Sequence, residues 1–177
     1  DMKNLHVQSD FSNKFEALGV QHELMAGVDY SRERKVVYSA LNANQGGVTI
    51  TKPTTTAGTP NDGAWVDEGT RVFRVGNEYV ATGFGAYVQD VIQVAPAWKV
   101  VGGVRYDNLN GDYDINAIPD AAAGPVTTTA YRMKVSEFSP RIGALFQPTP
   151  LHSFHVSAGS SFNTSGDAYS LGASNVD

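Results

Sequence analysis

The connections between the strand-like segments of this 177-residue chain alternate between short and long. Tight turns are expected at residues 17–19, 95–97 and 148–150, where glycine or proline interrupts the pattern. Two long polar segments separate them, at about residues 37–76 and 114–129. In an up-and-down antiparallel sheet, this order places every tight turn at one end and every long loop at the other. An unstructured loop of ~40 residues is uncommon in a compact soluble domain, so we expect a rigid sheet that carries functional loops at one end.

Six strands fit between these connections, and no capped amphipathic helix pattern interrupts them. Their expected ranges are residues 3–16, 20–36, 77–94, 98–113, 130–147 and 151–164. The predicted fold class is all-β. Several of these segments exceed the roughly 9–11 residues that cross a bilayer at a tilt. Long strands with loops of two lengths are typical of a transmembrane β-barrel whose strands project beyond the membrane.

Alternation of residue types within the strands supports a sheet with one lipid-facing side. Along residues 100–107, Val100, Val104 and Tyr106 share one face, whereas Arg105 and Asp107 share the other. Residues 138–147 and 154–163 alternate in a similar way. The first face suits lipid and the second suits a wet barrel interior.

One predicted strand does not separate into an apolar face and a polar face, and one set of aromatic residues has two interpretations. In residues 77–94, Asp90 shares a face with Phe84 and other apolar residues, so the register of this strand stays open. Trp98, Phe146 and Phe154 flank the tight turns. They fit either an aromatic girdle at a membrane interface or the packed core of a soluble sandwich.

Composition excludes several classes of protein. No apolar run approaches the ~18–20 residues of a spanning helix. The formal net charge of -5 and the lack of a basic stripe argue against nucleic-acid binding. Cysteine is absent, which excludes disulfides and thiolate sites. No catalytic motif is present and no histidine has metal-site spacing, so we expect neither an enzyme nor a resident metal or cofactor.

Five sequence segments then resemble, in order, the strand motifs of the TonB-dependent siderophore receptors of the catecholate type. They are residues 18–33 (LGVQHELMAGVDYSRE), 85–90 (GAYVQD), 98–107 (WKVVGGVRYD), 138–148 (FSPRIGALFQP) and 160–167 (SSFNTSGD). Together they extend over most of the chain. Thr164 departs from the motif, which commonly has proline there.

The resemblance implies that residues 1–177 are a partial receptor barrel domain. It would supply about six strands of a plugged barrel of about 22 strands. The plug domain and the C-terminal strands would be absent. The chain shows neither a signal peptide at its start nor a closing element at its end, which also indicates an internal fragment.

The function that the resemblance implies is import across the bacterial outer membrane without catalysis. A ferric siderophore would bind at the loops, with iron present only as part of this cargo. The TonB–ExbB–ExbD system would drive import through the absent plug segment, and outer-membrane lipid would surround the barrel. Two alternatives stay open from the residues alone. One is another outer-membrane barrel, porin-like or adhesive; the other is a soluble β-sandwich or lipocalin-like binding module.

Two groups of candidate site residues follow. Arginine and aromatic side chains suit an anionic, aromatic ferric catecholate. The ligand candidates in and beside the long loops are Trp65, Arg71, Phe73, Arg74, Tyr38 and Tyr113. The lumen-facing candidates are Arg105, Asp107 and Arg141. They contact the plug or the substrate path, or they pair with charges on neighbouring strands, and we favour the pairing role.

Overall fold

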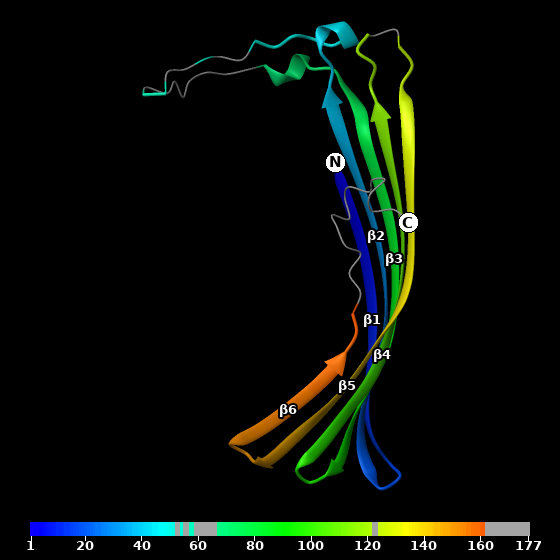
Figure 1. Cartoon of the computed structure of the whole chain (residues 1–177), viewed down its shortest axis with the longest axis vertical. Coiled ribbons are helices and arrows are strands. Elements are labelled where there is room, and N and C mark those ends of the chain that lie inside the picture. Colours follow the sequence, from blue (N-terminus) through cyan, green and yellow to red (C-terminus); the bar gives the residue numbers. More distant parts are fainter. Residues whose placement is uncertain (52–53, 55–56, 59–66, 122–123, 162–177) are drawn as a thin grey trace.

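The computed structural model describes every residue except 52–53, 55–56, 59–66, 122–123 and 162–177. The described strands form one curved antiparallel sheet in the order β1-β2-β3-β4-β5-β6 (Figure 1). Their bounds are β1 (Met2–Ala17), β2 (Val20–Ala40), β3 (Phe73–Ala95), β4 (Trp98–Ala117), β5 (Thr127–Thr149) and β6 (His152–Gly159). Neighbours in the sheet are also neighbours in sequence. This confirms the predicted all-β, up-and-down architecture.

The tight turns lie together at one end of the sheet, and the long connections leave from the other (Figure 1). Leu18 and Gly19 join β1 to β2 with φ angles of 55° and 79°. Two successive positive φ values characterise the hairpin turn that matches the twist of its strands. The first long connection contains two 3₁₀ turns, η1 (Ala43–Gln45) and η2 (Glu68–Thr70). No helix in the described part of the chain is long and apolar enough to span a membrane.

The strands are longer than predicted at their long-loop ends. β2 continues to Ala40 and β3 already begins at Phe73, because Ala40 pairs with Phe73. In the same way β4 and β5 pair as far as Ala117 and Thr127. Strand ladders therefore extend into segments that composition alone assigned to loops. β6 ends at Gly159, and residues 162–164 of the predicted last strand lie outside the described residues.

The register of residues 77–94 is fixed by pairing with both neighbours. Asp90 lies opposite Leu24 of β2 and Gly102 of β4, so it occupies the same face as the apolar residues around it. Its Oδ2 lies 2.6 Å from Nδ1 of His22, whose ring stacks on Phe15 at a centroid distance of 5.1 Å. A carboxylate on an otherwise apolar face is thus paired with a histidine of the adjacent strand.

The two faces of the sheet differ sharply in chemistry. We call the face with Val88, Val104 and Ile142 the outer face, and the face with Asp29 and Arg105 the inner face. On the outer face, one row of opposed residues is apolar across five strands: Phe11, Ala26, Val88, Val104 and Pro140. Exposed fractions on this face reach 66% for Phe138 and 69% for Val156. Large side chains this exposed over many strands require an apolar environment.

This apolar band has the height of a membrane. Along β4 it runs from Trp98 to Tyr106, nine residues counted inclusively, close to the roughly 9–11 residues of a tilted bilayer-crossing strand. Toward the long loops, the outer face changes to ion pairs such as Arg34–Glu78 at 2.7 Å. At the tight turns, Trp98 stacks on Phe146 at 4.5 Å, in a row that includes Phe154. These three aromatics lie on the exposed outer face and form its lower border.

Candidate functional site

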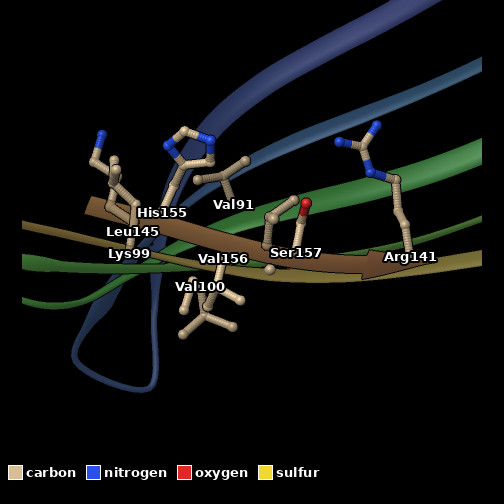
Figure 2. Close-up of a pocket in the computed structure, with 11 residues that line it drawn as sticks. Val91, Lys99, Val100, Arg141, Leu145, His155, Val156 and Ser157 are labelled. Atoms are coloured by element: carbon tan, nitrogen blue, oxygen red, sulfur yellow. The ribbon is translucent and has the colours of Figure 1, made fainter. Parts of the chain in front are cut away.

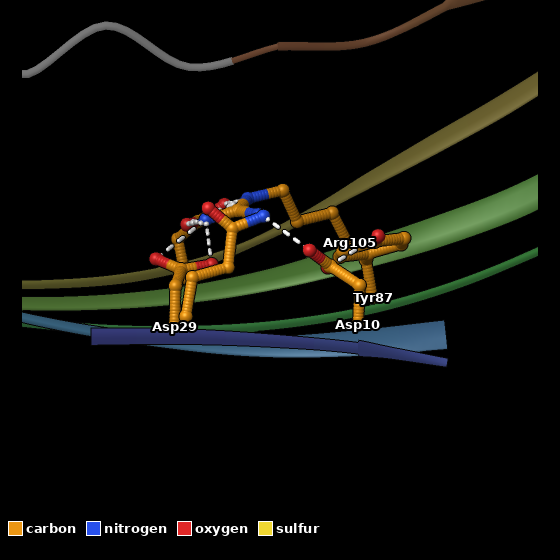
Figure 3. Close-up of polar contacts among 6 residues, drawn as sticks. Asp10, Asp29, Tyr87 and Arg105 are labelled. Carbon is orange, nitrogen blue, oxygen red and sulfur yellow. Dashed lines mark hydrogen bonds and ion pairs between the residues drawn. The ribbon is translucent and has the colours of Figure 1, made fainter. Parts of the chain in front are cut away.

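The middle of the inner face holds a charge network centred on Arg105 of β4 (Figure 3). Its Nη2 donates to Asp29 Oδ2 of β2 at 2.9 Å, and its Nε donates to Asp107 Oδ1 at 2.9 Å. One guanidinium thus bridges two carboxylates and crosses β3 to reach β2. Arg105 is therefore paired with Asp107 of its own strand and with Asp29 two strands away.

Two glycines of β2 and β3 make room for this network. A Cβ at Gly85 would collide with both Arg105 and Asp29, so the guanidinium passes over a position that has no side chain. At Gly27 a Cβ would collide with Asp10 and Tyr87. Beside the arginine, the Tyr87 hydroxyl donates to Asp10 Oδ1 at 2.8 Å, a separate hydrogen bond that joins β3 to β1. The arginine contacts and this bond together include residues from four strands, β1 to β4.

A second feature of the inner face is a hollow near the tight-turn end (Figure 2). Its volume is about 310 Å³, and its lining comes from β3, β4, β5 and β6. Lys99, Arg141 and His155 lie on the hollow's side of the sheet, whereas Val100 and Val156 point to the other side (Figure 2). Arg141, predicted to face the lumen together with Arg105, lines this hollow and also lies beside Arg105 in a second hollow of the inner face.

A packed tyrosine cluster lies on the inner face toward the long loops. Tyr79 and Tyr113 are 1% and 8% exposed and meet edge to face at a centroid distance of 6.4 Å. Tyr131, Leu109, Ile115 and Met133 pack against them. The ligand candidate Tyr113 is therefore a packed residue of the wall, whose ring already has protein neighbours.

The remaining ligand candidates lie around the rim from which the first long connection leaves. Tyr38 pairs opposite Val75 and Ala40 opposite Phe73, so Tyr38 and Phe73 share one face, with exposed fractions of 50% each. Arg74, opposite Ser39, lies on the other face. Arg71 is ion-paired to Glu68. Trp65 lies outside the described residues.

Sequence reasoning missed Asp10, Asp29 and Tyr87 as partners of the inner-face network. Asp29 lies between Val28 and Tyr30, an alternation that could have placed it on the polar face, whereas the segments around Asp10 and Tyr87 do not alternate in this way. The pairing of Asp29 with Arg105 across β3 requires the strand register, which no single segment supplies. Within the described part, no group of three or more histidine, aspartate or glutamate residues is placed to hold a metal ion.

The arrangement sets an ion-paired inner face against an exposed apolar outer face. A family model described as "TonB dependent receptor-like, beta-barrel" matches residues 2–177. Among curated proteins, the chain is 24% identical over 163 residues to the metal-pseudopaline receptor CntO of Pseudomonas aeruginosa. That match covers 90% of this chain and 21% of the relative.

Two solved structures share the fold. The ferric-catecholate import receptor Fiu of Escherichia coli K12, in its closed form, aligns with a TM-score of 0.71 and 21% identity, covering 89% of this chain and 23% of that one. The siderophore receptor PiuA of Acinetobacter baumannii aligns with a TM-score of 0.59 and 14% identity, covering 88% of this chain and 23% of that one. The chain thus spans between a fifth and a quarter of the length of these proteins.

Proposed function

The chain belongs to the TonB-dependent receptor β-barrel family, and we propose that it is a wall segment of an outer-membrane receptor that binds and imports a ferric siderophore. In this proposal the long loops receive the siderophore and the inner face lines its route. Energy arrives from the inner membrane through TonB. The chain contributes binding and positioning without catalysis, and iron is cargo.

The observation that carries the proposal is the division of one sheet into two chemically distinct faces. A membrane-high apolar band covers the outer face, and an ion-paired polar network covers the inner face. A barrel wall between lipid and a wet interior needs this division. A soluble sandwich would instead bury one face of each of two packed sheets, and the described strands form a single sheet.

The rim residue Arg74 supports a loop-side binding surface for an anionic complex. The exposed rings of Tyr38 and Phe73 lie on the opposite face of the sheet from Arg74. Arg74 offers a guanidinium with no hydrogen bond or ion pair recorded among the described residues. Arginine recognises planar oxyanions through paired hydrogen bonds. We assign Arg74 to contact with the bound complex, together with Trp65.

The test is uptake of radiolabelled iron by cells that express the complete receptor gene and lack their own siderophore receptors. We expect accumulation of iron supplied as a ferric catecholate, abolished by a proton uncoupler and by loss of TonB. Arg74→Ala should weaken binding at least tenfold and leave the amount of receptor in the outer membrane unchanged, whereas Phe73→Ala, on the opposite face of the sheet, should change binding little. Passive, TonB-independent uptake would instead identify a porin-like barrel and overturn the proposal.

A second candidate substrate class comes from the curated relative, which is a metal-pseudopaline receptor. The same uptake assay separates the two classes when metal–pseudopaline complexes and ferric catecholates are offered in parallel. Uptake of the metal–pseudopaline complex alone would retain the receptor function and replace the catecholate by that metallophore.

A further inference from the structure

The apolar band on the outer face ends well before the strands reach the long loops. Along β4 it stops at Tyr106, and the strand continues to Ala117. Residues 107–117 correspond to roughly 35 Å of strand, at ~3.3 Å per residue. We call the outer face of this part of the sheet the upper outer face. Its polar side chains include Arg32, Thr82, Asn108, Asn110, Lys134 and Ser136. This surface lies beyond the acyl-chain region, on the long-loop side.

Two cations on the upper outer face have no carboxylate partner. Arg32 of β2 and Lys134 of β5 lie in one row of opposed residues, with Thr82 and Asn110 between them. Both cations are exposed, and neither has a recorded hydrogen bond or ion pair among the described residues. Three strand spacings separate them, about 14 Å at ~4.8 Å per spacing. The pair is therefore available to two anionic groups held a fixed distance apart.

The next row toward the long loops differs, because the wall itself neutralises the arginines in it. Arg34 Nε donates to Glu78 Oε1 at 2.7 Å. Arg132 pairs with Asp112 at 3.1 Å and with Asp114 at 2.8 Å. The carboxylates of the upper outer face are thus used further from the apolar band. The two unpaired cations lie nearest the band, at the level where the polar ends of membrane lipids lie.

Amide and hydroxyl groups fill the space between the two unpaired cations. Asn110 Nδ2 donates to Asn108 Oδ1 at 2.9 Å, and Asn108 Nδ2 donates to Ser136 Oγ at 2.6 Å. These bonds hold the amides in place. They leave Asn110 Oδ1 and the Thr82 hydroxyl without a recorded partner in the described part of the chain. Amide oxygens and hydroxyls can accept and donate the hydrogen bonds that sugar hydroxyls need.

The outer face therefore has three layers that match one class of amphiphile. The apolar band suits acyl chains, the unpaired cations suit phosphates, and the groups between them suit a saccharide. A phospholipid with one phosphate would pair with one cation and leave the other without an anion. We propose that the upper outer face binds an acylated saccharide with two phosphates, a glycolipid of the lipopolysaccharide class from the outer leaflet. Arg32 and Lys134 each bind one phosphate, and Thr82 and Asn110 contact the sugar between them.

This inference rests on the proposed function only in requiring that the sheet is an outer-membrane wall with its long loops outside. In such a wall the upper outer face meets the outer leaflet. The site gives the lipid-facing side of the barrel its own ligand, separate from the loops that receive the siderophore.

The experiment is native mass spectrometry of the purified full-length receptor, titrated in detergent with one lipid at a time. The lipids are bisphosphorylated lipid A, its dephosphorylated form and phosphatidylglycerol. We expect saturable binding of bisphosphorylated lipid A, at least about tenfold tighter than binding of the other two, because only this lipid makes both phosphate contacts. The double variant Arg32→Gln and Lys134→Gln should lose at least about tenfold in affinity. The charge-conserving double variant Arg32→Lys and Lys134→Arg should retain most of the binding.

Arg34→Gln is the matched control, because Arg34 lies on the same strand and face as Arg32 and is already paired with Glu78. It should change the affinity for bisphosphorylated lipid A by less than about twofold. The urea midpoint of the Arg32→Gln and Lys134→Gln double variant should match that of the unaltered receptor, since neither cation has a partner in the described wall.

Three outcomes would overturn the inference: equal binding of the three lipids, an equal loss of affinity in Arg34→Gln, or unchanged affinity in the glutamine double variant. The first two would show that net charge alone attracts lipid. Lipid binding requires neither siderophore nor TonB. Loss of lipid selectivity with intact TonB-dependent iron uptake would contradict this inference alone, and selective lipid binding without iron uptake would contradict the proposed function alone.

Discussion

The inner face carries two arginines on adjacent strands, Arg105 of β4 and Arg141 of β5, and their contacts differ. In the network, Arg105 bridges Asp29 and Asp107 over the space left by Gly85 (Figure 3). In the hollow, Arg141 lies above a floor of small residues with no recorded carboxylate partner in the described part of the chain (Figure 2). The first arginine stabilises the wall, and the second is available to a partner.

The difference shows that charge inside a barrel wall has two separable roles. A bridged arginine lowers the cost of holding two carboxylates near each other and fixes strands that are not sequence neighbours. An unbridged arginine contributes little to the stability of the wall. Its contribution depends on the group that binds it. Substitutions that affect stability in one region and leave it unchanged in the other would establish this division.

Arg105→Met in the full-length receptor should give the largest loss of stability. It leaves Asp29 and Asp107 without their common partner, which costs about 3–5 kcal/mol where such a pair is fully buried. The Arg105 side chain is 39% exposed, so solvent screening reduces the expected loss to about 2–3 kcal/mol. The measurement is urea unfolding in detergent, followed by tryptophan fluorescence.

Arg141→Met is the matched control for Arg105→Met. It should change the free energy of unfolding by no more than about 0.5 kcal/mol, the usual range for an unpaired surface position. Equal losses for the two variants would show that Arg141 is also held by the wall and would erase the distinction between the two regions.

Gly85→Ala should give the next largest effect. The new methyl group collides with Arg105 and Asp29, so either the ion pair opens or the strands shift. Overpacking of this kind costs about 1–2 kcal/mol here, within the usual range for an inserted methyl group. The shift of the urea midpoint measures the loss.

Gly102→Ala provides the control because a Cβ there meets nothing within 4 Å. It adds a methyl group to the outer face of β4 and should be neutral. A loss at Gly102 as large as that at Gly85 would mean that strand glycines matter for a reason other than room for the network.

Much of the fold could be predicted from the sequence because its signals are local. Turn residues around Gly19 and Pro96 mark the tight turns, and alternation in residues 104–107 separates Val104 from Arg105. Strand ends were less predictable, since the pairing of Ala117 with Thr127 depends on a neighbouring strand. Register is a property of two segments together and cannot be read from one.

The candidate site was predictable to a lesser extent for the same reason. The two-residue alternation of side chains along each strand places Arg105 and Arg141 on one face, but it does not distinguish their surroundings. The distinction depends on which carboxylates lie opposite, and Asp29 is 76 positions away from Arg105 in the chain. Tyr113 shows a similar limit, because its burial against Tyr79 follows from the alignment of β3 with β4.

Tyr87→Phe should have a smaller effect than Gly85→Ala. It removes one hydrogen bond, from the Tyr87 hydroxyl to Asp10 Oδ1 at 2.8 Å, and keeps the aromatic ring in place. Both residues lie at the accessible edge of the network, so water can replace the lost donor. The expected result is a small decrease in the urea midpoint, below that of Gly85→Ala. A loss comparable to that of Arg105→Met would show that the network acts as one cooperative unit that extends to β1.

Lys14→Met should have the smallest effect on stability. Lys14 and Glu23 form an exposed pair at 2.8 Å, with side chains 77% and 42% exposed. Exposed pairs of this kind contribute little because both charges are well solvated in either state. We therefore expect no measurable change in the urea midpoint. A loss as large as that of Tyr87→Phe would show that this exposed pair also holds β1 against β2.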